Sequence, residues 1–324
     1  LRGNQKIRRL HRQTVRINRT NFAFQPPFAV EASQLFNFSA HLLTIASNSC
    51  YFDGEIFAID ENTDKSIFYW DHNSSVWVLF YTSTHAINEL ETIQGKLFYG
   101  GKRPGYFSSF SSSPVLIPTA SVPVGGGAFD YDEIFDFEEV GTDIYCGGDF
   151  TVATPSSGAV RKIDISGPTP VIITPPTIFN PDPISTIVVD LAAYNNQMIV
   201  NGLFDDGGNI KGIALYDLTS TPTALAGGLG PPLPSNNCGQ ACLGDVEVLN
   251  NKAYVLGGYS HVLDASGNAV TNTVGYSIYD FTTGTWQANT SSGSPASFWD
   301  IDEYNGFLYI CGFFNSIGGN SYPT

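Results

Sequence analysis

An internal repeat of short segments constrains the fold of this chain more than any other feature. Five segments share a polar turn, an apolar run and one or two small residues, and a degenerate sixth copy precedes them. With the last position of each copy as anchor, the copies end at residues 60, 101, 148, 202, 258 and 312. Their intervals of 41, 47, 54, 56 and 54 residues predict a series of similar units that stack on one another.

Each unit is predicted to contain an antiparallel β-hairpin. Residues 187–191 precede the turn at Asn195, and residues 245–248 precede the turn at Asn250. Asn-Asn and Asn-Gly steps permit the positive φ of a tight hairpin turn. The run after each turn is dense in Val, Ile, Tyr and Phe without strict alternation, which is typical of a strand covered on both faces. Glycines at its end leave room for neighbouring backbones.

A second, weaker motif follows the glycines and consists of an aromatic-Asp step, a turn and sometimes a Trp. It occurs at Trp70-Asp71 with Trp77, at Tyr216-Asp217, and at Tyr279-Asp280 with Trp286. The unit containing Gly257, Gly258, Tyr279 and Trp286 resembles the kelch-type β-propeller repeat. The resemblance covers roughly residues 45 to 320, although elsewhere the Trp is missing or a glycine is replaced, as by Asn201. It implies a fold and carries over no function.

The repeat and this resemblance predict an all-β fold, a β-propeller of about six blades with an N-terminal extension. We expect residues 1–40 to form a basic arm and extension and residues 41–324 to form the propeller. No Tyr-Asp strand follows Gly312, so ring closure would need a strand from Phe22 to Phe38 or from residues after Thr324. An open array of hairpins, or a β-sandwich followed by a partial propeller, are the alternatives.

Charge is unevenly distributed along the chain. The sequence has 15 basic and 30 acidic residues, and seven of the basic ones precede the first acid, Glu31. The remainder, with 8 basic and 30 acidic residues, would repel nucleic acid. The arm is expected to lie across an acidic surface of its own or of a neighbouring copy, unless it is a tail left by processing. Its basic residues are Arg2, Lys6, Arg8, Arg9, Arg12, Arg16 and Arg19.

Cysteines and sequons favour an extracellular setting. Cys238 and Cys242 lie in a Pro-rich loop where a disulfide is predicted, which would contribute only about 2 kcal/mol because the loop is short. Cys146 and Cys311 are expected to be buried thiols within strands. N-glycosylation sequons predict a secreted or cell-surface glycoprotein. They occur at Asn18, Asn37, Asn73 and Asn289.

No local sequence motif for catalysis is present, and no catalytic residue or cofactor is predicted. His72, His85 and His261 form no zinc motif, although loops of a propeller could bring them together. Kelch-type propellers include copper radical oxidases, so the resemblance leaves that enzyme class open. The acidic run that contains Asp130, Asp132 and Glu133 is expected to be a strand with one wet face. Calcium binding by these three residues is the alternative.

The function predicted from these features is that of an extracellular or cell-surface structural or interaction module. Its partners would be other copies of itself, another extracellular protein or a glycan, without a membrane span, since no run of 18 apolar residues occurs. A propeller-borne enzyme, either a copper oxidase or a glycan-processing enzyme, is one alternative. A carbohydrate-binding module that uses exposed Trp70, Trp77, Trp286 or Trp299 is another, although tryptophans at such positions more often pack between blades.

Overall fold

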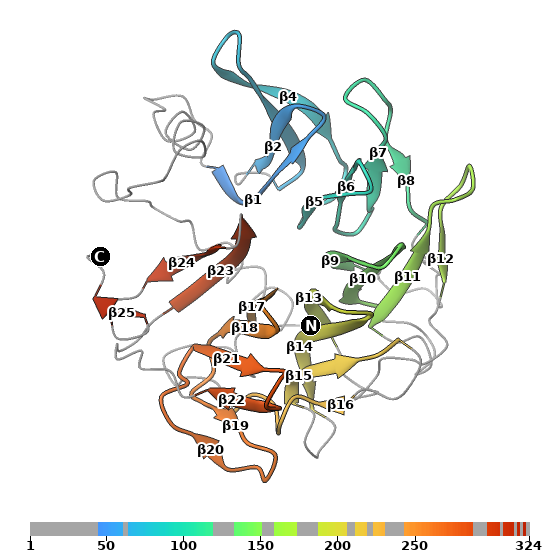
Figure 1. Ribbon diagram of the computed structural model, residues 1–324. Coiled ribbons are helices and arrows are strands. Elements are labelled where there is room, and N and C mark those ends of the chain that lie inside the picture. Colours follow the sequence, from blue (N-terminus) through green and yellow to red (C-terminus); the bar gives the residue numbers. More distant parts are fainter. Residues whose placement is uncertain are drawn as a thin grey trace, which may run out of the picture.

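The computed structural model of this protein describes twelve stretches of the chain. Its regular structure within them is entirely β, and no helix occurs there (Figure 1). The described residues are 45–60, 64–118, 133–150, 159–173, 187–205, 211–218, 223–230, 243–287, 297–304, 307–313, 316–317 and 320–321.

Five four-stranded antiparallel sheets and one two-stranded sheet follow one another along the chain, and we call them blades 1 to 6. Blade 1 contains β1 (Ile45–Phe52), β2 (Glu55–Asp60), β3 (Ser66–Asp71) and β4 (Val76–Thr82). Blade 2 contains β5 (Leu90–Ile93), β6 (Lys96–Tyr99), β7 (Gly105–Phe107) and β8 (Val115–Leu116). Blade 3 contains β9 (Glu133–Val140), β10 (Asp143–Asp149), β11 (Val160–Asp164) and β12 (Val171–Ile173).

The later blades follow the same order. Blade 4 contains β13 (Ile187–Tyr194), β14 (Gln197–Asp205), β15 (Lys211–Tyr216) and β16 (Thr223–Ala224). Blade 5 contains β17 (Leu243–Leu249), β18 (Lys252–Gly257), β21 (Tyr276–Asp280) and β22 (Thr285–Gln287). Blade 6 contains β23 (Ser297–Tyr304) and β24 (Phe307–Phe313). Two small hairpins, β19 (Val262–Leu263) with β20 (Ala269–Val270) and β25 (Ser316–Ile317) with β26 (Asn320–Ser321), lie outside these sheets.

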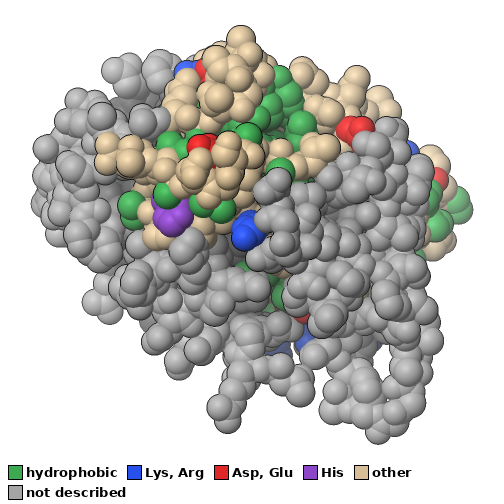
Figure 2. All heavy atoms as spheres, turned by 90° about the horizontal axis from the view of Figure 1, so that it is seen from below, with side chains coloured by type: hydrophobic (Ala, Val, Ile, Leu, Met, Phe, Trp, Pro, Cys, Tyr) green, Lys and Arg blue, Asp and Glu red, His purple; other side chains and the backbone are tan. Residues whose placement is uncertain are grey.

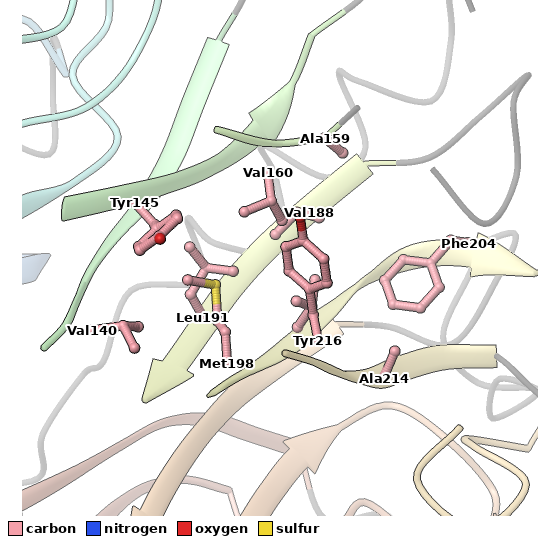
Figure 3. Packing of buried hydrophobic residues seen from close by; sticks show 11 residues of the cluster. Val140, Tyr145, Ala159, Val160, Val188, Leu191, Met198, Phe204, Ala214 and Tyr216 are labelled. Carbon is pink, nitrogen blue, oxygen red and sulfur yellow. The ribbon is translucent and has the colours of Figure 1, made fainter. Parts of the chain in front are cut away.

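The blades are arranged around a common centre, with the first strand of each blade nearest to it (Figure 1). Hydrophobic clusters join every successive pair from blades 1 and 2 to blades 5 and 6. Between blades 3 and 4, for example, Tyr145 and Val160 face Val188, Met198 and Tyr216 (Figure 3). The predicted β-propeller is confirmed, since blades 2 to 5 each pack against the blade before and the blade after them. The segment proposed for ring closure, Phe22 to Phe38, lies outside the described residues.

The turns that the sequence predicted have the expected geometry. Asn195 and Asn250 have φ angles of 55° and 51° at the tips of the β13–β14 and β17–β18 hairpins. The Asp of the aromatic-Asp motif caps the turn between the third and fourth strands. Asp71 Oδ1 accepts a hydrogen bond from the Asn73 amide at 2.9 Å, and Asp280 Oδ1 accepts one from the Thr282 amide at 2.8 Å. The motif is therefore an Asx turn.

Strand register corrects one anchor of the repeat. The anchor of blade 5 is Gly257, not Gly258, because its pairing with the inner strand matches that of the other anchors. The matching pairs are Gly148 with Ile134, Gly202 with Val188, Gly257 with Leu243 and Gly312 with Phe298. The last four anchors are then spaced by 54, 55 and 55 residues. The sequence pattern missed this because blade 5 has Leu256, not a small residue, before its anchor.

The anchor glycines are required by a close backbone approach. A Cβ at Gly148 would lie 2.1 Å from the carbonyl oxygen of Glu133, and one at Gly202 would lie 2.1 Å from that of Ile187. In both blades the approach lies beside a bulge of the inner strand. Any side chain at these positions would displace backbone, so glycine marks the end of the second strand.

Candidate interaction surfaces

Many of the predicted site residues lie outside the described residues, and the predictions for them are untested. These are Arg2, Lys6, Arg8, Arg9, Arg12, Arg16, Arg19, Asn18, Asn37, Asn289, Cys238, Cys242, Asp130, Asp132 and the side chain of Trp299. The sequon asparagine Asn73 is exposed in the β3–β4 turn. Cys146 is fully buried in β10, as predicted.

The expectation of a strand with one wet face was wrong for β9. Glu133 is only 3% exposed and Asp136 only 9%. Glu133 Oε1 accepts a hydrogen bond from Asn88 Nδ2 of the β4–β5 connection at 2.7 Å. These acids face neighbouring blades, so alternation of acids and aromatics marks two buried faces here. No group of three His, Cys, Asp or Glu side chains suited to a metal ion occurs in the described part of the chain.

The structure does not bring the three candidate histidines together among its described residues. His72 Nε2 lies 3.6 Å from Glu55 Oε2, whereas the Nδ1 atoms of His85 and His261 contact the neighbouring hydroxyl side chains.

Two of the described tryptophans are buried. Trp70 is 4% exposed and contacts Trp77, its cross-strand partner in the same blade, edge to face, with ring centroids 5.6 Å apart. Trp286 is 7% exposed and contacts Tyr279, its cross-strand partner, in the same way at 5.1 Å. Trp286 also belongs to the hydrophobic cluster between blades 4 and 5, so packing between blades is confirmed for Trp286.

A chain of aspartates links the inner strands of blades 3 to 6 near the propeller axis. Asp136 of β9 accepts a hydrogen bond from the Leu191 amide of β13 at 2.7 Å. Asp190 of β13 accepts one from the Val246 amide of β17, and Asp245 of β17 accepts one from the Ile301 amide of β23 at 3.0 Å. The inner strand is the edge of each sheet, so these carboxyl groups satisfy amides that the sheet leaves unpaired. We call Asp136, Asp190 and Asp245 the axial aspartates.

The axial aspartates also contact one another. The negative charges of Asp136 and Asp245 act on Asp190, which lies between them in the chain of contacts. Neighbouring buried carboxyl groups avoid like-charge repulsion when one of them carries a proton. Burial raises the pKa of Asp136 and of Asp190 well above the usual range, and the neighbouring acids raise both further. Burial, with Glu247 nearby, likewise raises the pKa of Glu138 to about 8.

Sequence analysis missed the axial aspartates although a signal was present. Each lies twelve residues before the anchor glycine of its blade, as Asp136 does before Gly148. Asp300 of β23 has the same spacing from Gly312. Glu89, which precedes β5, lies at the same distance from Gly101, so the spacing marks one acid in each of blades 2 to 6.

The axial aspartates predict that the protein is more stable in mild acid than in base. Their raised pKa values, and that of Glu138, mean that the native state keeps protons that the unfolded chain releases at lower pH. This stabilisation is complete below about pH 4 and is lost as the pH rises through the folded-state pKa, about 8 for Glu138. We expect Tm to be about 5 °C higher near pH 5.5 than near pH 8.5.

Scanning fluorimetry across this range checks the expectation. Hydrogen bonds in the Asx turns lower the pKa of Asp71, Asp164 and Asp280, so their contribution is lost only in stronger acid. A Tm that rises steadily from pH 5.5 to pH 8.5 would contradict the protonated state of the axial aspartates.

The outer strands of blades 1 to 3 expose large apolar side chains. Val76 and Leu79 of β4 are 47% and 54% exposed, and Leu116 of β8 is 50% exposed. Val171 and Ile173 of β12 are 52% and 41% exposed. The outer strands of blades 4 and 5, in contrast, expose the threonines of β16 and β22. We call Val76, Leu79, Leu116, Val171 and Ile173 the apolar rim.

The described outer strands, those of blades 1 to 5, are built from uncharged sequence. Each described outer strand lies in a stretch without Lys, Arg, Asp or Glu. These stretches are residues 72–88, 104–129, 165–181, 218–244 and 281–299. The negative charge therefore belongs mainly to the inner strands and the hairpin turns. In the coloured part of the face in Figure 2, acidic side chains (red) are likewise scattered among apolar (green) and uncharged atoms.

Comparison with solved structures supports the fold. The extracellular domain of the one-component system BT4673 from B. thetaiotaomicron aligns with a TM-score of 0.53 and 10% identity, over 82% of this chain and 31% of that chain. YCF48 bound to D1 peptide aligns with a TM-score of 0.50 and 10% identity, over 87% of this chain and 82% of that chain. BamB from Moraxella catarrhalis aligns with a TM-score of 0.44 and 11% identity, over 82% and 66% respectively.

These similarities concern the fold alone. YCF48 is a β-propeller, as this chain is. The chain spans less than two thirds of the length of the BamB and BT4673 chains. No family model and no curated protein sequence matches it. Within the described residues, no helix is long and apolar enough to cross a membrane.

Proposed function

We propose that this β-propeller is an extracellular or cell-surface interaction module that binds protein partners through the apolar rim. The observation that carries the proposal is the contrast along the outer edge. Blades 1 to 3 expose Val, Leu and Ile side chains there, whereas blades 4 and 5 expose threonines. Exposure of apolar side chains to water is unfavourable, and their burial in a protein interface lowers the free energy.

The chemistry of the apolar rim fits an uncharged protein surface better than a charged partner. Its outer strands carry no charge, so a partner neither needs nor meets a charged group along them. Outer strands also present unpaired backbone amides and carbonyls, to which an extended segment can bind. YCF48, which shares the fold, is bound to a peptide.

Three finer features belong to this proposal. The exposed sequon at Asn73 supports a glycoprotein that is secreted or held at the cell surface. The cross-strand pair of Tyr279 and Trp286 supports the kelch type of repeat. The basic arm, residues 1–20, would strengthen assembly by contacting the acidic body of another copy.

Site-specific photo-crosslinking tests the proposal. A photoreactive phenylalanine is placed at position 116 or 171 of the apolar rim in the full chain, which is expressed in secreting eukaryotic cells. The matched controls carry the same group at positions 223 and 285, which are also exposed, on the outer strands of blades 4 and 5. We expect covalent adducts at least about fivefold more abundant from the rim positions, because burial of apolar area holds a partner there.

Mass spectrometry of the adducts identifies the partner as another protein or a second copy. Adducts from positions 223 and 285 in equal yield, or no adducts from position 116, would refute the apolar rim as a binding surface.

A further inference from the structure

Asn201 of β14 is fully buried, and one atom of its side-chain amide is unsatisfied. Its Nδ2 atom donates a hydrogen bond to the carbonyl oxygen of Gly244 in β17 at 3.1 Å. Its Oδ1 atom has no hydrogen-bond partner among the described residues, although the side chain is 0% exposed. The two amide atoms cannot be exchanged, because Oδ1 would then face a carbonyl that only accepts. A buried acceptor without a donor costs free energy, so we expect a donor beside Oδ1.

Asp190 of β13 lies beside Asn201 on the same face of blade 4. The two residues are cross-strand partners in the ladder of β13 and β14. Ala192 and Ile199 lie two residues away along the same strands and belong to the hydrophobic cluster between blades 4 and 5. Because side chains alternate between the faces of a strand, Asp190 and Asn201 also face blade 5. Their hydrogen bonds agree with this, since both reach the backbone of β17.

The neighbouring axial aspartate Asp245 has the contacts of a carboxylate. It accepts amide hydrogen bonds on both oxygens, from Val246 at 2.9 Å and from Ile301 at 3.0 Å. Asp190 also accepts from the Val246 amide, so two carboxyl groups share one amide hydrogen. Ionisation of Asp190 would place a second negative charge at this shared donor. The arrangement therefore favours a neutral Asp190 beside an ionised Asp245.

No basic side chain offsets the acids around Asp190. The strands β9, β10, β14 and β17 pack against β13, and neither they nor β13 contain Lys or Arg. The charged groups that act on Asp190 are Asp136 of β9 and Asp245 of β17. Glu138 and Glu247 follow two residues further along these strands and add to the negative charge. Burial, and then the charges of Asp245 and Asp136, raise the pKa of Asp190 well above its usual range.

We propose that Asp190 is protonated in the native protein and that its O–H group donates a hydrogen bond to Asn201 Oδ1, so that the two side chains clamp blade 4 to blade 5. With this proton, the Val246 amide donates to Asp190 and Asp190 donates to Asn201. Asn201 in turn donates to the Gly244 carbonyl, which completes the row. Without the proton, two acceptors face each other inside the protein.

The clamp is consequently a pH-sensitive contact between two blades. It is closed while Asp190 is protonated, and it weakens as the pH rises through the folded-state pKa of that group. The inference goes beyond the proposed function, because the clamp lies inside the propeller and does not depend on what the apolar rim binds.

The number of protons held by the clamp provides a test. Between the unfolded-state pKa of about 4 and a higher folded-state pKa, each proton that the native state retains raises the unfolding constant about tenfold per pH unit. The wild-type clamp needs one proton. Asp190→Asn needs none, because its NH₂ group donates to Asn201 Oδ1. Asn201→Asp needs two, because the new carboxyl group must itself donate to the Gly244 carbonyl. The double variant with both changes needs one again.

Urea unfolding of the full chain at pH 5 and pH 6.5 measures these numbers. Between the two pH values, the unfolding constant of Asn201→Asp should rise about 30-fold more than that of wild type, and that of Asp190→Asn about 30-fold less. The double variant should match wild type. The control Asn272→Asp makes the same change at an exposed asparagine and should also match wild type.

A wild-type pH dependence of Asn201→Asp would overturn the clamp, because residue 201 would then lie outside the row of donors. The same result for Asp190→Asn would mean that Asp190 is ionised, and it would overturn the clamp as well. If Asn201→Asp does not fold at pH 5, the double variant decides. The clamp requires that Asp190→Asn restores folding to it, and a double variant that stays unfolded contradicts the proposal.

Discussion

Asp190→Ala is expected to lower the free energy of unfolding by about 3 kcal/mol, whereas Asp190→Asn changes it by less than about 1 kcal/mol at neutral pH. Alanine removes the acceptor of the Val246 amide and the partner of both neighbouring axial aspartates. Asparagine keeps an oxygen that accepts from Val246 and an NH₂ group that donates to a carboxylate. It therefore reproduces the protonated aspartate that the raised pKa implies.

Urea unfolding at pH 5.5 and pH 8.5 measures both variants. Because asparagine does not titrate, Asp190→Asn should also reduce the loss of stability between these two pH values. Asp164→Asn is the matched control, since Asp164 caps an exposed turn through the Ser166 amide and has a lowered pKa. If Asp190→Asn is as destabilising as Asp190→Ala, Asp190 is ionised in the native protein, and the inference that it carries a proton is wrong.

Phe57→Ala is expected to lower the free energy of unfolding by about 3 to 5 kcal/mol. The Phe57 ring is fully buried in the aromatic cluster between blades 1 and 2. Its centroid lies 5.0 Å from that of Phe80 and 6.1 Å from that of Phe110 in the β7–β8 connection. Loss of the ring leaves a cavity that these neighbours cannot fill, because each is fixed by further aromatic contacts.

Tyr51→Ala is the matched control for Phe57→Ala. Tyr51 lies on β1, opposite Ile56 of the neighbouring strand, yet is 61% exposed. Chemical unfolding should give a change within about 0.5 kcal/mol for this variant. Similar losses for the two variants would mean that blades 1 and 2 are not packed through this cluster.

The blade hairpins could be predicted from the sequence because their signals are local. Asn195 and Asn250 mark turns by a backbone preference of the residue itself, and the Asp of each aromatic-Asp step caps its own turn. The anchor of blade 5 was misplaced by one residue because residues 257 and 258 are both glycine, and the sequence alone does not show which of them is the anchor. Only the pairing of Gly257 with Leu243 distinguishes them.

The axial aspartates could not be recognised from local pattern because their partners lie about one repeat away. Asp136 contacts Leu191, which is 55 residues later, so its role depends on how two blades pack. The same is true of Asn201, which replaces a small residue of the repeat. Its Nδ2 donates to the carbonyl of Gly244 in blade 5, and a Cβ at Gly244 would lie 2.4 Å from the Leu256 backbone. Asn201 thus joins blade 4 to blade 5, where the close approach to β18 requires a glycine at position 244.

The apolar rim was also invisible to the sequence patterns used. An outer strand and a buried strand can both be rich in Val and Leu. Only the position of the strand in its sheet decides whether these side chains are exposed. Phe80 and Leu79 illustrate this, because a bulge at Phe80 in β4 leaves Phe80 half-buried against blade 2 and Leu79 54% exposed.

Hydrogen–deuterium exchange on the assembly isolated from expressing cells tests the central claim most directly. Amides of residues 76–82, 115–116 and 171–173 should exchange at least about tenfold more slowly in the assembly than in the isolated chain, because a bound partner covers them. Residues 223–224 and 285–287, on the outer strands of blades 4 and 5, should exchange at the same rate in both. Slower exchange confined to blades 4 and 5, or no difference on any outer strand, would contradict the apolar rim as the surface through which this propeller acts.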